Sequence, residues 1–256
     1  MTTSERQSVE ALLAWYAAMG ADEAIGEAPL DGFAQNAAPS PAPERKSIPS
    51  APRVIARPRA DPIGARGIGE ASTLAELEAM VAQFDGCPLK RTAKSLCFAR
   101  GSEQARVMLI GEAPGRDEDL QGKPFVGRAG QLLDRMLASV GLGEEHCYIT
   151  NVIYWRPPGN RTPTPQEVEA CAPFLARQIE LLNPQMLVLL GGAAAKSILG
   201  VSEGIMRLRG KWLTYRSGSR EVPTLATLHP AYLLRNAVDK RLAWRDLLAL
   251  KAALEK

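Results

Sequence analysis

Four short apolar runs, separated by longer helical patterns, constrain the fold of this chain more than any other feature. The runs are predicted as strands over 106–111, 147–153, 185–190 and 222–228. Apolar residues recur at helical spacing between them, over 130–140, 165–182 and 193–199, and again over 238–254. Strands that alternate with helices indicate a parallel sheet covered on both faces. We therefore expect an α/β fold, a three-layer α/β/α sandwich around a four-stranded parallel central sheet.

The remaining sequence divides into three regions. Residues 1–26 contain an apolar-periodic stretch and are predicted to form an N-terminal helical segment. Residues 27–71 are rich in Pro, Ala and Gly and poor in large apolar residues, which predicts a disordered linker. The folded domain is predicted over 72–256, and it opens with a capping-box signature, Thr73 with Glu76, for a helix to about Phe84. A Trp-bearing segment over 207–215 is predicted as a hairpin at one sheet edge.

Composition and charge narrow the class of protein only coarsely. Hydrophobic residues make up 46% of the chain, but no apolar run has membrane-spanning length. The first residues show no secretory signal pattern, so we expect a cytoplasmic protein of bacterial type without a membrane partner. The net charge of +3 does not identify a partner. Basic clusters over 206–220 and 235–245 suit a polyanion, although each alone is more typical of a solvated surface.

Polar and aromatic side chains follow the predicted strands where the strands end. Glu112 lies in a Gly/Pro turn after the first strand, Asn151 ends the second and His229 follows the fourth, while Phe125 precedes a helix. The carboxyl ends of parallel strands meet at one edge of a sheet, where such folds bind ligands. An amide reads the edge of a base, an aromatic ring stacks on it, a neutral imidazole stabilises developing charge and a carboxylate orients water. The set predicts a pocket for a planar heterocycle.

Each of these residues also has a purely structural interpretation. A carboxylate in a turn can cap a helix, an Asn can end a strand, a Phe can belong to the core and a His can be a satisfied core residue. Their joint occurrence at matching strand ends favours function. Two other functions stay open, a non-catalytic nucleic-acid-binding domain and a nucleotide-binding enzyme with a phosphate loop at 111–115. That loop lacks the GxGxxG and Walker patterns.

Three motifs, from about Cys87 to the C-terminus, resemble the family 4, thermophile-type uracil-DNA glycosylases. They read GEAPG…ED…PFVGRAGQLLD, then ITNV..WRPPGNRTPTPQE, then LHPAYLLR. The resemblance implies a monofunctional DNA glycosylase, a hydrolase that flips deoxyuridine out of DNA and cleaves its N-glycosidic bond. The abasic site left behind starts base excision repair of the DNA damage. The implied partner is uracil-containing DNA, single- or double-stranded, and a monomer is expected.

The resemblance also assigns roles to individual residues. In catalysis, Glu112 would position or activate water, His229 would stabilise the negative charge at uracil O2, and Asn151 would read the uracil edge. The implied base-pocket residues are Ala113, Glu118, Phe125 and Asn151, with Phe125 stacking on the ring. The implied DNA interface comprises a wedge into the base stack, Leu233, and the phosphate contacts Arg235 and Arg161.

The chain departs from the family at the iron–sulfur ligands. Most members hold a [4Fe–4S] cluster on four cysteines, and here only Cys87 and Cys171 keep their positions. Lys90 and Trp155 occupy the other two, and neither side chain replaces a thiolate on iron. We therefore predict no cofactor. The alternative is a cluster held by Cys87 and Cys171 plus Cys97 or Cys147.

Overall fold

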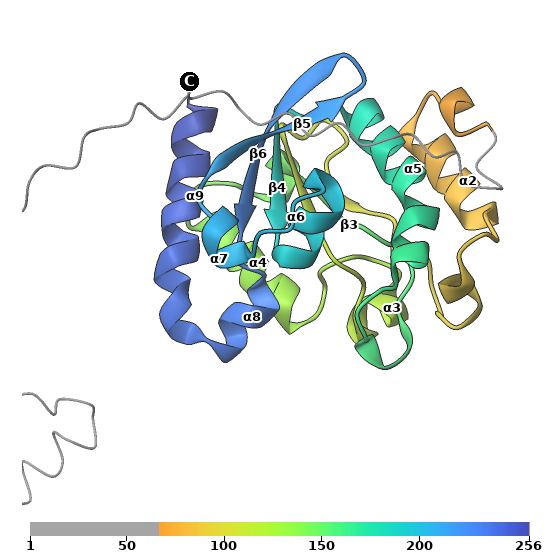
Figure 1. Ribbon diagram of the computed structural model, residues 1–256, viewed down its shortest axis with the longest axis horizontal. Coiled ribbons are helices and arrows are strands. Elements are labelled where there is room, and N and C mark those ends of the chain that lie inside the picture. Colours follow the sequence, from red (N-terminus) through yellow and green to blue (C-terminus); the bar gives the residue numbers. More distant parts are fainter. Residues whose placement is uncertain (1–66, 256) are drawn as a thin grey trace, which may run out of the picture. The chain divides into compact units, whose positions relative to one another are not determined.

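The computed structural model describes residues 67–255, which form a domain around one six-stranded sheet of order β1-β3-β2-β4-β6-β5 (Figure 1). The four central strands are parallel: β3 (Cys147–Asn151), β2 (Val107–Gly111), β4 (Met186–Leu190) and β6 (Arg220–Thr227). Two edge strands are antiparallel to their neighbours, β1 (Arg100–Gly101) and β5 (Trp212–Ser217). The predicted four-stranded parallel sheet is confirmed, and the two edge strands extend it.

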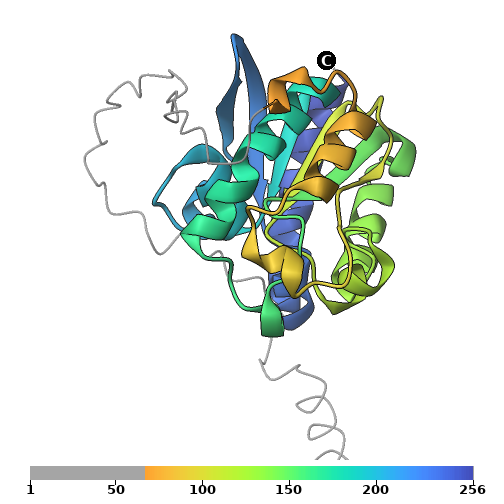
Figure 2. The same cartoon turned by 90° about the vertical axis from the view of Figure 1, so that its right-hand side faces the viewer.

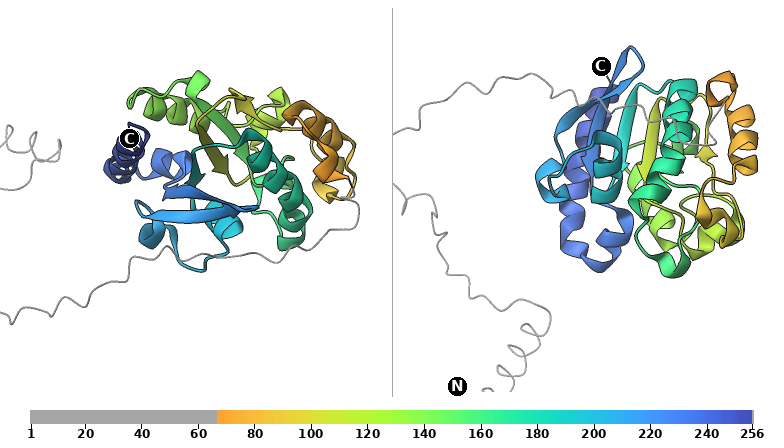
Figure 3. Two further views of the ribbon diagram at one scale, coloured as in Figure 1. Left: turned by 90° about the horizontal axis from the view of Figure 1, so that it is seen from above. Right: turned by 45° about the vertical axis from the view of Figure 1, so that its right-hand side comes forward.

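Helices cover both faces of the sheet, which makes the three layers (Figures 2 and 3). One face carries α4 (Arg128–Ala138) and α9 (Lys240–Leu254), and the other carries α2 (Leu74–Gln83), α5 (Pro165–Leu182) and α6 (Gly192–Leu199). Successive strand residues point to opposite faces. Val107 and Leu109 therefore lie in the core with α4 and α9, whereas Met108 and Ile110 lie in the core with the other three helices.

The local sequence explains where the strands and helices begin and end. All five residues of β2 and of β3 are buried, as expected for strands covered on both faces. The predicted capping box of Thr73 and Glu76 begins α2. A second one, Thr164 with Glu167, begins α5, and Asn183 ends that helix in the left-handed conformation.

The structure corrects the predicted start of the domain. The described fold begins at Gly67, and the 3-10 helix η2 (Ile68–Glu70) precedes the predicted boundary at Ser72. Ile68 and Ala71 are buried in the core, so residues 67–71 belong to the packed domain and not to the linker predicted over 27–71. The predicted helical segment 1–26 and the rest of that linker lie outside the described residues.

Several short elements were not predicted, because each is too brief to show a periodic pattern. They are the helices α3 (Arg116–Gln121), α7 (Ile205–Leu208) and α8 (Pro230–Arg235) and the 3-10 helices η3 (Pro88–Arg91), η4 (Glu144–His146), η5 (Pro158–Asn160) and η6 (Ala237–Asp239). The hairpin predicted over 207–215 is formed by β5 and β6, so it begins later than expected. Within 67–255, no helix is long and apolar enough to cross a bilayer.

Candidate active site

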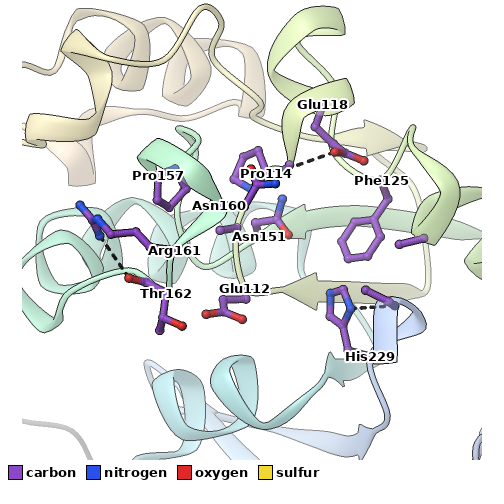
Figure 4. A pocket seen from close by; sticks show the side chains of 14 residues that line it. Glu112, Pro114, Glu118, Phe125, Asn151, Pro157, Asn160, Arg161, Thr162 and His229 are labelled. Carbon is purple, nitrogen blue, oxygen red and sulfur yellow. Dashed lines mark hydrogen bonds between the residues drawn. The ribbon is translucent and has the colours of Figure 1, made fainter. Parts of the chain in front are cut away.

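A pocket of about 240 Å³ opens at the carboxyl edge of the parallel strands (Figure 4). It is formed by the segments that follow β2, β3 and β6, together with the start of α4. Fourteen residues line it. Among them are all the residues predicted for catalysis or for the base pocket, namely Glu112, Ala113, Glu118, Phe125, Asn151 and His229.

Asn151 ends β3 beside Gly111, the last residue of β2. Its side chain is 1% exposed, and neither Nδ2 nor Oδ1 has a hydrogen-bond partner among the described residues. An unpaired buried polar group costs about 1–3 kcal/mol, so native proteins seldom contain one without a functional reason. The amide presents a donor group, Nδ2, beside an acceptor, Oδ1, which is the pattern needed to bind the edge of a planar base.

Gly111 makes room for both the amide and the aromatic ring of the pocket. A Cβ atom at this position would lie 2.5 Å from Asn151 Oδ1 and 2.5 Å from Phe125 Cζ. Any larger residue would therefore separate the two side chains. Sequence reasoning did not single out Gly111 as a pocket residue, because its role depends on a contact between distant segments.

Phe125 is held in an uncommon backbone conformation. Its φ of 55° lies in the left-handed region, which is disfavoured for a residue with a bulky side chain. The backbone of α4 packs directly against it, since a Cβ at Gly130 would lie 1.7 Å from the Phe125 carbonyl oxygen. The ring centroid is 5.6 Å from that of His229, with an interplanar angle of 33°. The ring is therefore fixed in place by the surrounding chain before any ligand binds.

Glu118 connects the two loops that flank the base side of the pocket. Its Oε2 accepts the N–H of Gly115 at 3.1 Å (Figure 4). Its Oε1 accepts the N–H groups of Val126 at 3.0 Å and Gly127 at 2.9 Å. Its carboxylate is thus directed at backbone N–H groups. The resemblance implied a base-pocket role for Glu118, and the geometry indicates that it acts by positioning the loop after β2 relative to Phe125.

Replacing Glu118 by alanine is expected to impair both stability and catalysis. Three N–H groups would lose a charged acceptor, which we expect to lower the free energy of unfolding by about 2–3 kcal/mol. Displacement of Phe125 by about 1 Å would lower kcat by up to roughly 100-fold. Urea unfolding and kcat measurements check this. The control is Asp117→Ala, which removes the same charge from an exposed position in α3; equal effects of the two variants would contradict the assignment.

His229 is the N-cap residue of α8, and its Nδ1 accepts the N–H of Ala231 at 3.1 Å. An acceptor Nδ1 carries no proton, so the neutral ring carries its proton on Nε2. Burial, reinforced by the nearby Arg235 charge, lowers the pKa of His229 to about 4. The imidazole is therefore neutral at physiological pH and offers an Nε2–H donor to the pocket.

Glu112 directly follows β2 and lines the pocket half-buried. Burial raises the pKa of its carboxyl above the ordinary value of 4.5. Within the described part of the chain, Glu112 has no hydrogen-bond or ion-pair partner, so its carboxylate is available to a water or ligand in the pocket. A desolvated carboxylate of this kind suits the activation of a water molecule.

One wall of the pocket was missed by sequence reasoning. It is formed by the segment around η5, with Pro157, Asn160 and Thr162 in the lining. Asn160 adopts a left-handed φ of 55°, and its Oδ1 accepts Arg156 Nε at 2.6 Å. The signal that was available is the dense run of Pro, Gly and Asn directly after the Asn151 strand, which marks an ordered loop at the pocket edge.

Leu233, the predicted DNA wedge, is buried in the described domain, and its role at DNA remains a prediction. Its side chain is 0% exposed and packs in a small core cluster with Leu132, Leu228 and Ala243. The next residue, Leu234, is 38% exposed. The sequence contains two consecutive leucines here, and only the rotation of α8 decides which of them faces solvent.

Leu233→Ala is therefore expected to destabilise the fold, whereas Leu234→Ala should leave its stability nearly unchanged. Emptying the Leu233 site should cost about 2–5 kcal/mol of folding free energy, as for other buried leucines. Removing the exposed Leu234 side chain should leave stability within about 0.5 kcal/mol. Thermal or urea unfolding of both variants checks the assignment, which fails if Leu234→Ala is the more destabilised protein.

The two predicted phosphate contacts differ in their availability. Arg235 is exposed at the end of α8. Arg161 lines the pocket, but its two terminal nitrogens donate to Glu167 at 2.9 and 2.6 Å, and one of them also donates to the Thr162 carbonyl. This ion pair holds the pKa of Glu167 down to about 2. Arg161 thus has a structural partner already, and its contact with DNA remains a prediction.

The residues present do not fit a four-thiolate iron–sulfur cluster. Cys87 and Cys171 are buried within hydrogen-bonding reach of each other. Lys90 Nζ instead pairs with Asp85 at 2.7 Å, and Trp155 is buried edge-on against Tyr154 with centroids 6.2 Å apart.

The alternative ligands do not complete the set either. Cys97 donates to the Glu118 carbonyl at 3.2 Å, and Cys147 lies in the core beneath α4 and α9, on the face of the sheet opposite Cys171. Among residues 67–255, no three or more Cys, His, Asp or Glu side chains are grouped to hold a metal.

Comparison with known proteins identifies the class to which this fold and pocket belong. The sequence model of the uracil DNA glycosylase superfamily matches residues 98–248, so the chain belongs to that superfamily. Within it, the chain is similar to type-4 uracil-DNA glycosylases.

Three of these relatives illustrate the similarity. The Archaeoglobus fulgidus protein is 46% identical over 152 residues, which cover 58% of this chain and 76% of the relative. The Thermotoga maritima protein is 39% identical over 179 residues, covering 69% of this chain and 92% of the relative. The Pyrobaculum aerophilum type-4 protein is 40% identical over 166 residues, covering 63% of this chain and 85% of the relative. The resemblance seen in the sequence motifs is thereby confirmed.

Proposed function

We propose that this protein is a uracil-DNA glycosylase that hydrolyses the N-glycosidic bond of deoxyuridine in DNA and so starts base excision repair. The observation that carries the proposal is the buried, unpaired amide of Asn151, held beside the Phe125 ring by Gly111. A planar base with adjacent donor and acceptor groups satisfies this amide while its face stacks on the ring. Superfamily membership and the type-4 relatives support the choice of uracil.

The pocket is recessed, so the base must leave the DNA stack before it can bind. Extrusion costs a few kcal/mol and is cheapest for a mismatched or single-stranded base. Stacking on Phe125, worth about 1–3 kcal/mol, offsets part of this cost. Asn151 then hydrogen-bonds the uracil edge, and Ala113 and Pro114 complete the lining near Glu112.

In the chemical step, the bond between C1′ and uracil N1 breaks and its electron pair moves onto the base. His229 stabilises the charge that develops at uracil O2 by donating from Nε2. A water oriented by Glu112 adds to C1′, its proton passes to the carboxylate or to solvent, and the products are free uracil and an abasic site. None of the fourteen lining residues is a lysine, which supports hydrolysis without a Schiff-base intermediate.

A labelled oligonucleotide with a single uracil, treated with the protein and then with alkali, tests the proposal. Cleavage at the uracil position, absent from the matched thymine oligonucleotide, is the expected result. Binding without cleavage would instead support a non-catalytic nucleic-acid-binding domain. Stabilisation of the protein against unfolding by a nucleoside triphosphate, with no release of uracil from DNA, would support the phosphate-loop alternative.

We further propose that the protein needs no cofactor and acts as a cytoplasmic monomer on uracil-containing DNA. The misfit of Lys90 and Trp155 to cluster ligation supports the first part. The purified protein should be colourless, without the broad visible absorption of an iron–sulfur cluster. About four iron and four sulfide atoms per chain would overturn the proposal of no cofactor. Sedimentation of a stable dimer would overturn the proposal of a monomer.

A further inference from the structure

Exposed apolar side chains gather on one segment of the domain. Seven large apolar residues within 67–255 are exposed, and four of them fall between residues 234 and 248. These four are Leu234, Val238, Trp244 and Leu248. Trp244 and Leu248 are four residues apart in α9, so they share one face of that helix. An exposed apolar concentration of this kind marks an interaction surface.

The same segment carries unpaired positive charge. Four basic residues are exposed here, and none of their side chains forms a hydrogen bond or ion pair with another described residue: Arg235, Lys240, Arg241 and Arg245.

The acids of the segment do not neutralise this charge. Asp239 accepts the Tyr232 hydroxyl at 2.6 Å. Asp246 is buried, where it pairs with Arg209 and accepts the Thr227 hydroxyl at 2.7 Å. The exposed side of the segment is therefore basic.

The outer face of α9 is fixed in position, and the chain leads to α9 directly from His229 in the pocket. Asp246 ties α9 to β6 through Thr227, two residues before His229. From His229 the chain runs through α8 and η6 directly into α9. In Figures 1 and 3, α9 is the outermost helix on its side of the described domain, and α8 lies beside its first turns. A strand that leaves the pocket along α8 would thus meet α9 next.

We propose that the outer face of α9, formed by Arg241, Trp244, Arg245 and Leu248, binds a single-stranded segment of DNA that flanks the uracil. The arginines contact phosphates, and Trp244 stacks on an unpaired base. This inference rests on the proposed function for the identity of the substrate. A single strand is favoured over duplex because an indole ring can stack only on a base whose face is free. From Arg241 to Leu248, α9 rises about 10 Å, so the face spans a short stretch of the strand next to the uracil.

The test compares uracil-containing single strands with long flanks and with one nucleotide on each side of the uracil. Trp244→Ala is expected to raise KM on the long strand about five- to tenfold, a defect that grows with flank length. The matched control is Trp212→Ala, because Trp212 in β5 is 40% exposed and Trp244 is 42% exposed. The double variant Arg241→Gln/Arg245→Gln should reduce the slope of log affinity against log salt by about 1.4, which is two phosphate contacts to a single strand. The charge control is Lys196→Gln, an exposed cation in α6.

Binding of a uracil-free single strand, measured by fluorescence anisotropy, separates this inference from the proposed function. If the protein fails to release uracil but binds the strand through Trp244, the surface assignment stands and the glycosylase proposal falls. If uracil is released and Trp244→Ala behaves like Trp212→Ala, the surface assignment falls alone. Capture of an acidic peptide by this face, with unchanged strand affinity in the variants, would also overturn it in favour of a protein partner.

Discussion

Replacing Asn151 by leucine should make the protein more stable and nearly inactive. Leucine has the branched shape of asparagine and removes two buried polar atoms that have no partner in the described domain. Relief of that penalty should raise the free energy of unfolding by about 1–3 kcal/mol. The same change removes both hydrogen bonds proposed for the uracil edge, which predicts a loss of at least about 100-fold in kcat/KM. Stability gained together with activity lost is the pattern expected of a residue retained for function.

The matched control is Gln178→Met, since Gln178 is a second fully buried amide within residues 67–255. It is fully satisfied, because its Oε1 accepts the Tyr154 hydroxyl at 3.0 Å and its Nε2 donates to the Tyr148 hydroxyl at 2.8 Å. Removing the amide leaves the Tyr154 and Tyr148 hydroxyls without this partner. The free energy of unfolding should fall by about 1–3 kcal/mol, and activity should remain. Urea unfolding and uracil release measure both variants. A less stable Asn151→Leu protein would show that the amide is satisfied in the folded protein after all.

His229→Ala should lower kcat by about 10²–10³-fold, the usual effect of removing one donor to a developing negative charge. Because the pKa of His229 is lowered to about 4, the neutral form persists through the working range. The activity of the wild type should then show no ionisation near 6.5. Activity should be present above the raised pKa of the Glu112 carboxyl and should be lost as the pH falls through it.

The pH dependence of stability gives a second, independent readout of His229. Between its ordinary pKa of 6.5 and about 4, the unfolded chain binds a proton at His229 that the folded protein does not. Stability should therefore decline as the pH falls through this window, and His229→Ala should lose that part of the decline. An acid limb of kcat/KM near pH 6.5 that disappears in the variant would contradict the neutral imidazole.

The layers of the fold could be predicted from the sequence because their signals are local. Buried parallel strands are continuous apolar runs, and long helices such as α5 carry a cap and a periodic face. Among the elements that escaped prediction, α3 and α8 have six residues each and bury few side chains. In such short helices the tertiary contacts decide the conformation.

The candidate site divides in the same way. Glu112, Asn151 and His229 could be predicted to meet because each follows a parallel strand, and strand ends converge by topology. The roles of Gly111 and Glu118 could not, because each depends on an atomic contact between two loops. Which of Leu233 and Leu234 faces solvent depends on the rotation of α8. Two identical neighbours in a sequence do not reveal that rotation.

The three backbone bonds to Glu118 have a consequence for how the protein can close on DNA. Since one carboxylate joins the loop after β2 to the loop before α4, those two walls can shift only as a single rigid body. Any tightening around an extruded nucleotide must then come from the other walls, which are the segment around η5 and the segment that carries His229 and α8. Induced fit in this enzyme would be one-sided, with a stationary base receptor and any movement confined to the walls opposite it.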